Sequence, residues 1–107
     1  MPHLFLDCDG VLADFNAGAA DVLGMSPHAF EDRHGKREFW RRIARARDFY
    51  ASLPLMSDAR LLFDAVAHLD PIILTGLPLG NRAAPQKVRW ADEHFPGTHI
   101  VTCMARD

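Results

Sequence analysis

The sequence has little cysteine, no excess of either charge and no long apolar run. Among its 107 residues there are two cysteines, Cys8 and Cys103, and the net charge is −2. The spacing of the two cysteines matches neither a disulfide framework nor a metal site. The balance of charges gives no general attraction to nucleic acid or an anionic membrane. No secretory signal and no apolar stretch of membrane-spanning length is visible. We therefore expect a cytoplasmic protein with reduced thiols, which binds neither a nucleic acid polymer nor a membrane.

The residues that are present predict a small α/β protein. Apolar segments at 3–8, 72–74 and 99–104 are hydrophobic at consecutive positions, which is typical of strands buried on both faces of a parallel sheet. Between them, the spacing of apolar residues and the capping residues predict helices at 14–23, 27–35, 36–47, 58–69 and 85–95. A loop containing Pro78, Gly80 and Asn81 follows the second strand. The order of strands and helices indicates parallel strands with right-handed crossovers.

The segment between the first and second predicted strands is much longer than the segment between the second and third. Connections between elements are usually short, so we interpret residues 15–55 as a helical insertion that covers the sheet. Residues 1–14 together with 56–107 then form the core domain.

Polar residues follow the first two predicted strands, where ligands bind in open α/β sheets. Asp7 and Asp9 follow the first strand, Thr75 and Gly76 follow the second, and Lys87 lies in the first turns of the next helix. Strand side chains alternate, so Asp7 and Asp9 are expected to point the same way and to address one site. Carboxylate oxygens suit Mg²⁺, and both aspartates are therefore candidate metal ligands.

These residue types fit phosphoryl transfer. One carboxylate can attack phosphorus while the second moves a proton. The backbone N–H of Gly10 can approach phosphate oxygens, and Thr75, Gly76 and Lys87 can hold the phosphoryl group. Alternatives that ascribe no chemistry to these residues are a turn capped by an aspartate, a threonine that caps a loop and an ordinary surface lysine.

The segment Asp-Cys-Asp-Gly-Val-Leu at 7–12 resembles the first motif of the haloacid dehalogenase-like phosphohydrolase superfamily. Ile-Ile-Leu-Thr-Gly at 72–76 resembles its second motif, and Lys87 resembles the lysine of its third. Within that superfamily, residues 9–15 and 87–90 are most similar to the deoxyribonucleotidase branch. The resemblance extends from about Leu4 to Met104.

The resemblance implies a three-layer Rossmann-like fold, here C-terminally incomplete, with a small helical cap inserted after the first strand. It implies an Mg²⁺-dependent phosphatase in which Asp7 attacks the phosphorus and forms an aspartyl-phosphate. Asp9 would be the general acid and base and would also bind the metal. Thr75 and Lys87 would hold the phosphoryl group of a small phosphorylated metabolite, with nucleoside monophosphates among the candidates.

A fourth motif of the family, an acidic pair after a further strand, has no counterpart before the chain stops at Asp107. A fragment of a longer protein, a truncated gene and a second chain that supplies the missing strand all remain open explanations. The first strand is then left with an unpaired edge, through which two copies could form a homodimer. The alternative to an enzyme is therefore a non-catalytic remnant that binds phosphate ligands or associates with itself.

Four aromatic residues lie in the predicted insertion. Phe39 and Trp40 belong to the apolar stripe of a helix, and we interpret them as packing residues. Phe49 and Tyr50 lie in a connection, and we interpret them as the residues that stack on a substrate ring.

Overall fold

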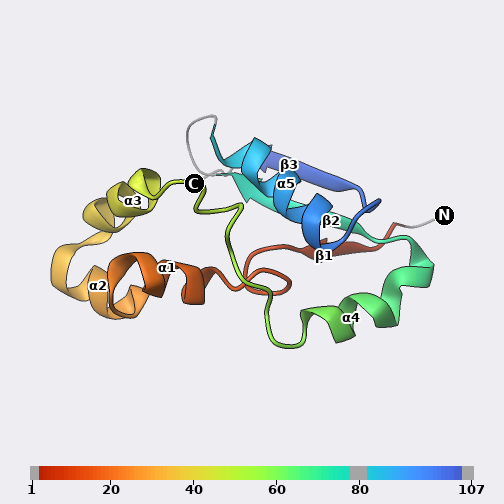
Figure 1. Cartoon of the computed structure of the whole chain (residues 1–107), viewed down its shortest axis with the longest axis horizontal. Coiled ribbons are helices and arrows are strands. Elements are labelled where there is room, and N and C mark those ends of the chain that lie inside the picture. Colours follow the sequence, from red (N-terminus) through yellow and green to blue (C-terminus); the bar gives the residue numbers. More distant parts are fainter. Residues whose placement is uncertain (1–2, 78–81, 105–107) are drawn as a thin grey trace.

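The computed structural model describes residues 3–77 and 82–104, and within them helices connect the strands of a three-stranded parallel sheet (Figure 1). The predicted loop residues Pro78, Gly80 and Asn81 lie outside these ranges. In chain order, the elements are β1 (Phe5–Asp7), α1 (Phe15–Leu23), α2 (Pro27–His34), α3 (Lys36–Arg45), α4 (Ala59–Val66), the 3₁₀ turn η1 (Ala67–Leu69), β2 (Ile72–Leu77), α5 (Ala83–His94) and β3 (Ile100–Met104). This arrangement confirms the predicted α/β class.

The strands lie in the order β1–β2–β3, so β2 is central and β1 is an edge of the described sheet. Leu6 pairs with Ile73, and Ile73 pairs with Ile100. These three side chains join the hydrophobic core, and Ile73 is fully buried. Successive side chains of a strand point to opposite faces, and Phe5 and Val101 are accordingly exposed on the other face.

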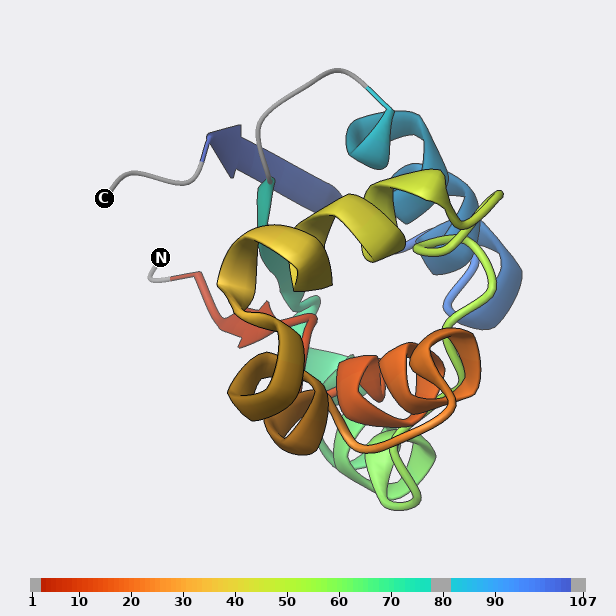
Figure 2. The ribbon, with the colours of Figure 1, turned by 90° about the vertical axis from the view of Figure 1, so that its left-hand side faces the viewer.

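Helices α4 and α5, which connect the strands, lie on one side of the sheet (Figure 2). Each strand is added on the same side of the one before it, and right-handed crossovers that step in one direction place their helices on one face. The described residues therefore form two layers rather than the expected three, and the second helical layer is not among residues 3–77 and 82–104.

Several element boundaries differ from the sequence prediction. β1 ends at Asp7 instead of continuing through Cys8, and α3 ends at Arg45. β2 extends to Leu77, so Thr75 and Gly76 lie within the strand instead of after it. α5 begins at Ala83, which puts Pro85 in the first turn, where a backbone N–H is not needed for intrahelical bonding.

The capping residues of the first two helices explain where they begin. Asp14 caps α1, with its side chain accepting a hydrogen bond from the backbone N–H of Ala17. Ser26 caps α2 in the same way through Ala29, and Pro27 occupies the first helical position, as predicted. Gly24, with a φ of 76°, ends α1 in the left-handed region that favours glycine.

Helices α1, α2 and α3 pack on one another at the end of the molecule where the strands have their carboxyl ends (Figure 1). Aromatic rings hold this group together, and Phe15 lies 5.4 Å from Phe49 and 6.4 Å from Phe39 between ring centroids. The described chain is elongated as a result, with principal extents of 46 × 27 × 23 Å. The division into a core and an insertion at 15–55 stays a prediction. None of the described helices has the length and apolar character needed to cross a membrane.

Candidate functional site

A tight loop follows β1 and carries the second aspartate of the motif. The carbonyl of Cys8 accepts hydrogen bonds from the backbone N–H groups of Leu12 and Ala13, both at 2.9 Å. Gly10, whose φ is 83°, donates to the carbonyl of Ala13 at 2.8 Å. Only glycine adopts that conformation without strain. The loop thereby turns back on itself and presents Asp9 beyond the end of the sheet.

Lys87 is the centre of the site, because its ammonium group connects three parts of the chain. The side chain is 3% exposed and comes from the second turn of α5. Its Nζ donates to Asp9 Oδ2 at 2.9 Å, to Thr75 Oγ1 at 2.6 Å and to the carbonyl oxygen of Gly76 at 2.7 Å. Three donors therefore meet three acceptors, which is what a buried ammonium group requires. The predicted convergence of these four residues is confirmed.

Asp7 is placed differently. It is the last residue of β1, lies opposite Leu74 and is exposed. Alternation puts it on the same face as Phe5, away from Leu6 and the core. Because the strand ends at Asp7 and Asp9 lies in the loop, alternation along a strand does not apply to this pair, and the expectation that both carboxylates address one site stays a prediction. Within the described part of the chain, the Asp7 carboxylate forms no hydrogen bond or ion pair.

For the predicted Mg²⁺ site, the described residues offer the two carboxylates of Asp7 and Asp9 and no larger cluster of potential metal ligands. Among residues 3–77 and 82–104, no group of three or more His, Cys, Asp or Glu side chains is placed to hold a metal ion. Asp7 and Asp9 supply the oxygen ligands that Mg²⁺ prefers, and Mg²⁺ in proteins often uses only one or two carboxylates with water and substrate oxygens. Mg²⁺ at Asp7 and Asp9 stays a prediction.

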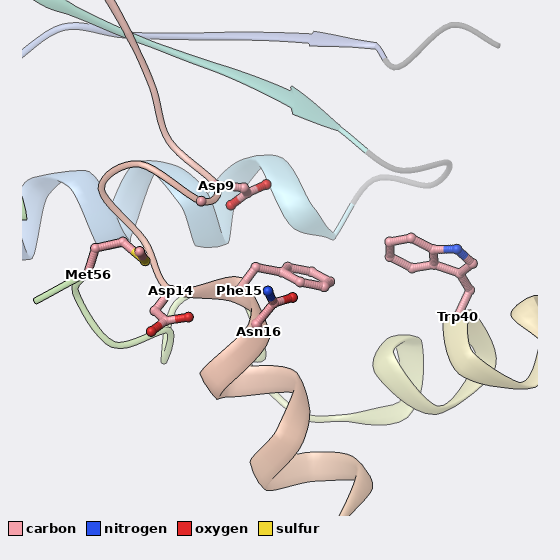
Figure 3. Close-up of a pocket in the computed structure, with 7 residues that line it drawn as sticks. Asp9, Asp14, Phe15, Asn16, Trp40 and Met56 are labelled. Carbon is pink, nitrogen blue, oxygen red and sulfur yellow. The ribbon is translucent and has the colours of Figure 1, made fainter. Parts of the chain in front are cut away.

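A pocket of about 400 Å³ opens beside Asp9. Its lining combines carboxylate, amide and aromatic side chains from the first-motif loop, α1 and its N-cap, and α3, with one methionine from the segment before α4 (Figure 3). The residues are Asp9, Gly10, Asp14, Phe15, Asn16, Trp40 and Met56. The rings of Phe15 and Trp40 approach one another from two helices, with centroids 6.0 Å apart and planes at 48°. The pocket therefore offers aromatic surface next to the carboxylate that contacts Lys87.

The structure overturns the predicted assignment for three of the four aromatic residues, whereas Phe39, 4% exposed, packs in the core as predicted. Phe49 and Tyr50 are buried in the core, with exposed fractions of 5% and 9%, which leaves little ring surface for a ligand. Trp40, interpreted as a packing residue, is 46% exposed and lines the pocket. A signal for this was present in the sequence. Phe39 and Ile43 lie on one helical line, and Trp40 is rotated about 100° from Phe39 toward the edge of the buried stripe.

Burial dominates the acid–base behaviour of Cys8. It raises the pKa of the thiol from 9.0 to about 12, and the nearby Asp9 carboxylate adds to this increase. Both Cys8 and Cys103 are free thiols, the first buried and the second exposed.

Comparison with known proteins identifies no relative, because no protein-family model and no curated protein matches the chain. The resemblance to the haloacid dehalogenase-like superfamily therefore rests on the sequence motifs alone.

The two thiols are expected to react at very different rates with iodoacetamide. At about pH 8, labelling of Cys103 in the folded protein should be at least about 100-fold faster than labelling of Cys8, because the thiolate is the reactive form. The raised pKa of Cys8 means that the folded state holds this proton more tightly. Its contribution to stability is present below pH 9.0 and is lost as the pH rises toward about 12. Mass spectrometry of the Cys8→Ser and Cys103→Ser variants measures each site separately, and comparable rates at the two thiols would contradict this account.

Proposed function

We propose that the chain is a phosphomonoester hydrolase of the haloacid dehalogenase type that works with Mg²⁺. The observation that carries the proposal is the buried Lys87 ammonium, held between Asp9, Thr75 and Gly76 where β1 and β2 end. A fixed cation beside a hydroxyl and a carboxylate stabilises a transferring phosphoryl group. The proposal includes the three-layer fold of that superfamily and a cytoplasmic location.

In the proposed reaction, an oxygen of the Asp7 carboxylate forms a bond to phosphorus while the bond from phosphorus to the ester oxygen breaks. Asp9 gives a proton to the leaving oxygen. Asp9 then takes a proton from water, whose oxygen attacks phosphorus and releases inorganic phosphate from Asp7. Mg²⁺ bound by Asp7 and Asp9 would neutralise charge on the phosphoryl oxygens.

The hydrogen bonds of Lys87 determine how a phosphoryl group would reach its ammonium group. Its three N–H donors are taken by protein acceptors, so a phosphoryl oxygen has to replace one of them to be bound. Of the two side-chain acceptors, Asp9 is the one to be replaced, because its side chain is 37% exposed while Thr75 is buried. Substrate binding would thereby release Asp9 from Lys87 for proton transfer.

The pocket beside Asp9 supports a substrate with a planar ring. Phe15 and Trp40 provide apolar ring surface, and Asn16 and Asp14 provide hydrogen-bonding groups next to it. Aromatic surfaces stack on planar ligands of many kinds. Aryl phosphates and nucleoside monophosphates therefore fit the pocket better than small alkyl phosphates.

A second candidate function is phosphate binding without hydrolysis. The observation in its favour is that the described residues hold no cluster of three or more potential metal ligands. In this form the chain would keep the Lys87 phosphate site, and copies could associate through the free edge of β1.

Replacement of Asp7 tests the first candidate. We expect the chain to hydrolyse para-nitrophenyl phosphate in the presence of Mg²⁺, and Asp7→Asn to lower turnover by about 10³-fold or more, since an amide does not form the acyl phosphate. Asp21→Asn, an exposed change on α1, serves as the control and should retain activity.

The outcomes of this assay separate the two functions. Unchanged turnover in Asp7→Asn would overturn the assignment of the nucleophile. Absence of turnover in the unaltered chain, with calorimetric binding of inorganic phosphate, would favour the second candidate. Absence of both would contradict the phosphate site itself.

Replacement of Trp40 tests the substrate class. Trp40→Ala should raise KM for an aryl phosphate or a nucleoside monophosphate about fivefold or more, because the stacking surface is removed. KM for glycerol phosphate should change little, since that substrate has no ring. Leu61→Ala, an exposed apolar change on α4, provides the matched control. An equal effect on both kinds of substrate would show that Trp40 does not select for a ring.

A further inference from the structure

The ammonium group of Lys87 has a fourth neighbour besides its three hydrogen-bond acceptors. Its Nζ lies over the ring of Tyr50, 5.0 Å from the ring centroid. A cation within about 6 Å of an aromatic centroid is attracted by the negative face of the ring, most strongly where water is excluded. Lys87 is 3% exposed and Tyr50 is 9% exposed, so this contact is largely shielded from solvent.

Tyr50 is held in place by the helix that carries Lys87. The backbone N–H groups of Tyr50 and Ala51 both donate to Gln86 Oε1, at 2.8 Å and 3.4 Å. Gln86 immediately precedes Lys87 on α5. The ring and the ammonium group are therefore positioned by neighbouring residues of the same helix.

Two further contacts extend this attachment along the chain. Arg89 donates to Asp48 Oδ1 at 2.9 Å, and the indole N–H of Trp90 donates to the carbonyl of Leu53 at 2.7 Å. Segment 48–53 thus follows α5 over more than one helical turn, and Figure 2 shows the two side by side. This segment continues from α3 toward α4, so the attachment also ties the helical group α1–α3 to the site.

The hydroxyl of Tyr50 carries no charge at physiological pH. Burial, with a smaller effect of Asp9, raises its pKa to about 12. The face of a neutral ring is then what Tyr50 offers to the ammonium group. The Tyr50 ring also lies 6.5 Å from the ring of Phe15, centroid to centroid, and Phe15 lines the pocket.

We propose that Tyr50 is a positioning residue, whose ring face holds the Lys87 ammonium in the orientation that receives a phosphoryl group. This rests on the proposed function for the identity of the ligand, and on geometry alone for the contact between ring and ammonium. The proposal replaces the stacking role that the sequence predicted for Tyr50.

Fluorination of the ring at position 50 separates the attraction between ring face and Lys87 ammonium from the packing of the ring. Phenylalanine and its mono-, di- and trifluorinated forms, incorporated at position 50, keep nearly the same shape while the negative face of the ring is progressively lost. We expect Tyr50→Phe to bind inorganic phosphate as the unaltered chain does. The trifluorinated form should bind it about threefold or more weakly, with intermediate values between. The same series at Phe49, a buried ring 5.0 Å from Tyr50, is the control and should leave the affinity unchanged.

An NMR measurement tests the contact without any ligand. The ε-methylene protons of Lys87 should be shifted upfield by the ring current in the unaltered chain and in Tyr50→Phe, and should return toward ordinary values in Tyr50→Leu. If Tyr50→Leu does not fold, the fluorinated series still gives the answer.

The results distinguish a failure of the proposed function from a failure of the positioning role of Tyr50. No phosphate binding by the unaltered chain, with the upfield shift present, would overturn the proposed function and leave the contact standing. Phosphate affinity that is independent of fluorination at position 50 would overturn the role of Tyr50, as would an equal loss from fluorination at Phe49.

Discussion

The burial of one ammonium group is the constraint on which the rest of the site depends. Lys87 is 3% exposed, and an unpaired charge at that depth would cost several kcal/mol. Its three acceptors come from the loop after β1 and from the carboxyl-terminal half of β2, and the lysine itself comes from α5. Satisfying one side chain therefore fixes the positions of three segments. Of the two side-chain acceptors in this set, the Asp9 carboxylate is 37% exposed and is the one that water and ligands reach, whereas Thr75 is buried.

The same lysine links the sheet to the helices that stand beyond its strands. Tyr50 covers the ammonium group and contacts Phe15, and Phe15 contributes to the pocket together with Trp40. Phosphate binding at Lys87 and ring binding at Trp40 would thus both occur against one aromatic cluster. This physical continuity is the reason for assigning the pocket and the lysine to one substrate rather than to two ligands.

Much of this arrangement could be predicted from the sequence, because parallel strands bring their carboxyl ends to one edge. That rule, with the position of Lys87 early in the next helix, predicted that Asp9, Thr75, Gly76 and Lys87 meet, together with Asp7. Local capping rules predicted the start of α2 at Pro27. The remaining features depend on tertiary packing. The burial of Phe49 and Tyr50 follows from the attachment of their segment to α5, which no local pattern encodes. Asp7 is exposed because it shares a face of the sheet with the exposed Phe5, whereas the consecutive apolar residues predicted a strand buried on both faces.

A double-mutant cycle on the free energy of unfolding tests the central role of Lys87 most directly. Two ion pairs of equal length make the comparison: Lys87–Asp9 and Arg89–Asp48, both at 2.9 Å. The first includes a side chain that is 3% exposed, whereas both members of the second are more than half exposed. For Asp9→Ala with Lys87→Met, we predict a coupling energy of about 1–3 kcal/mol. Solvent screening should keep the coupling of Asp48→Ala with Arg89→Met below about 0.5 kcal/mol. Equal coupling in the two cycles would contradict the view that the buried ammonium organises the site.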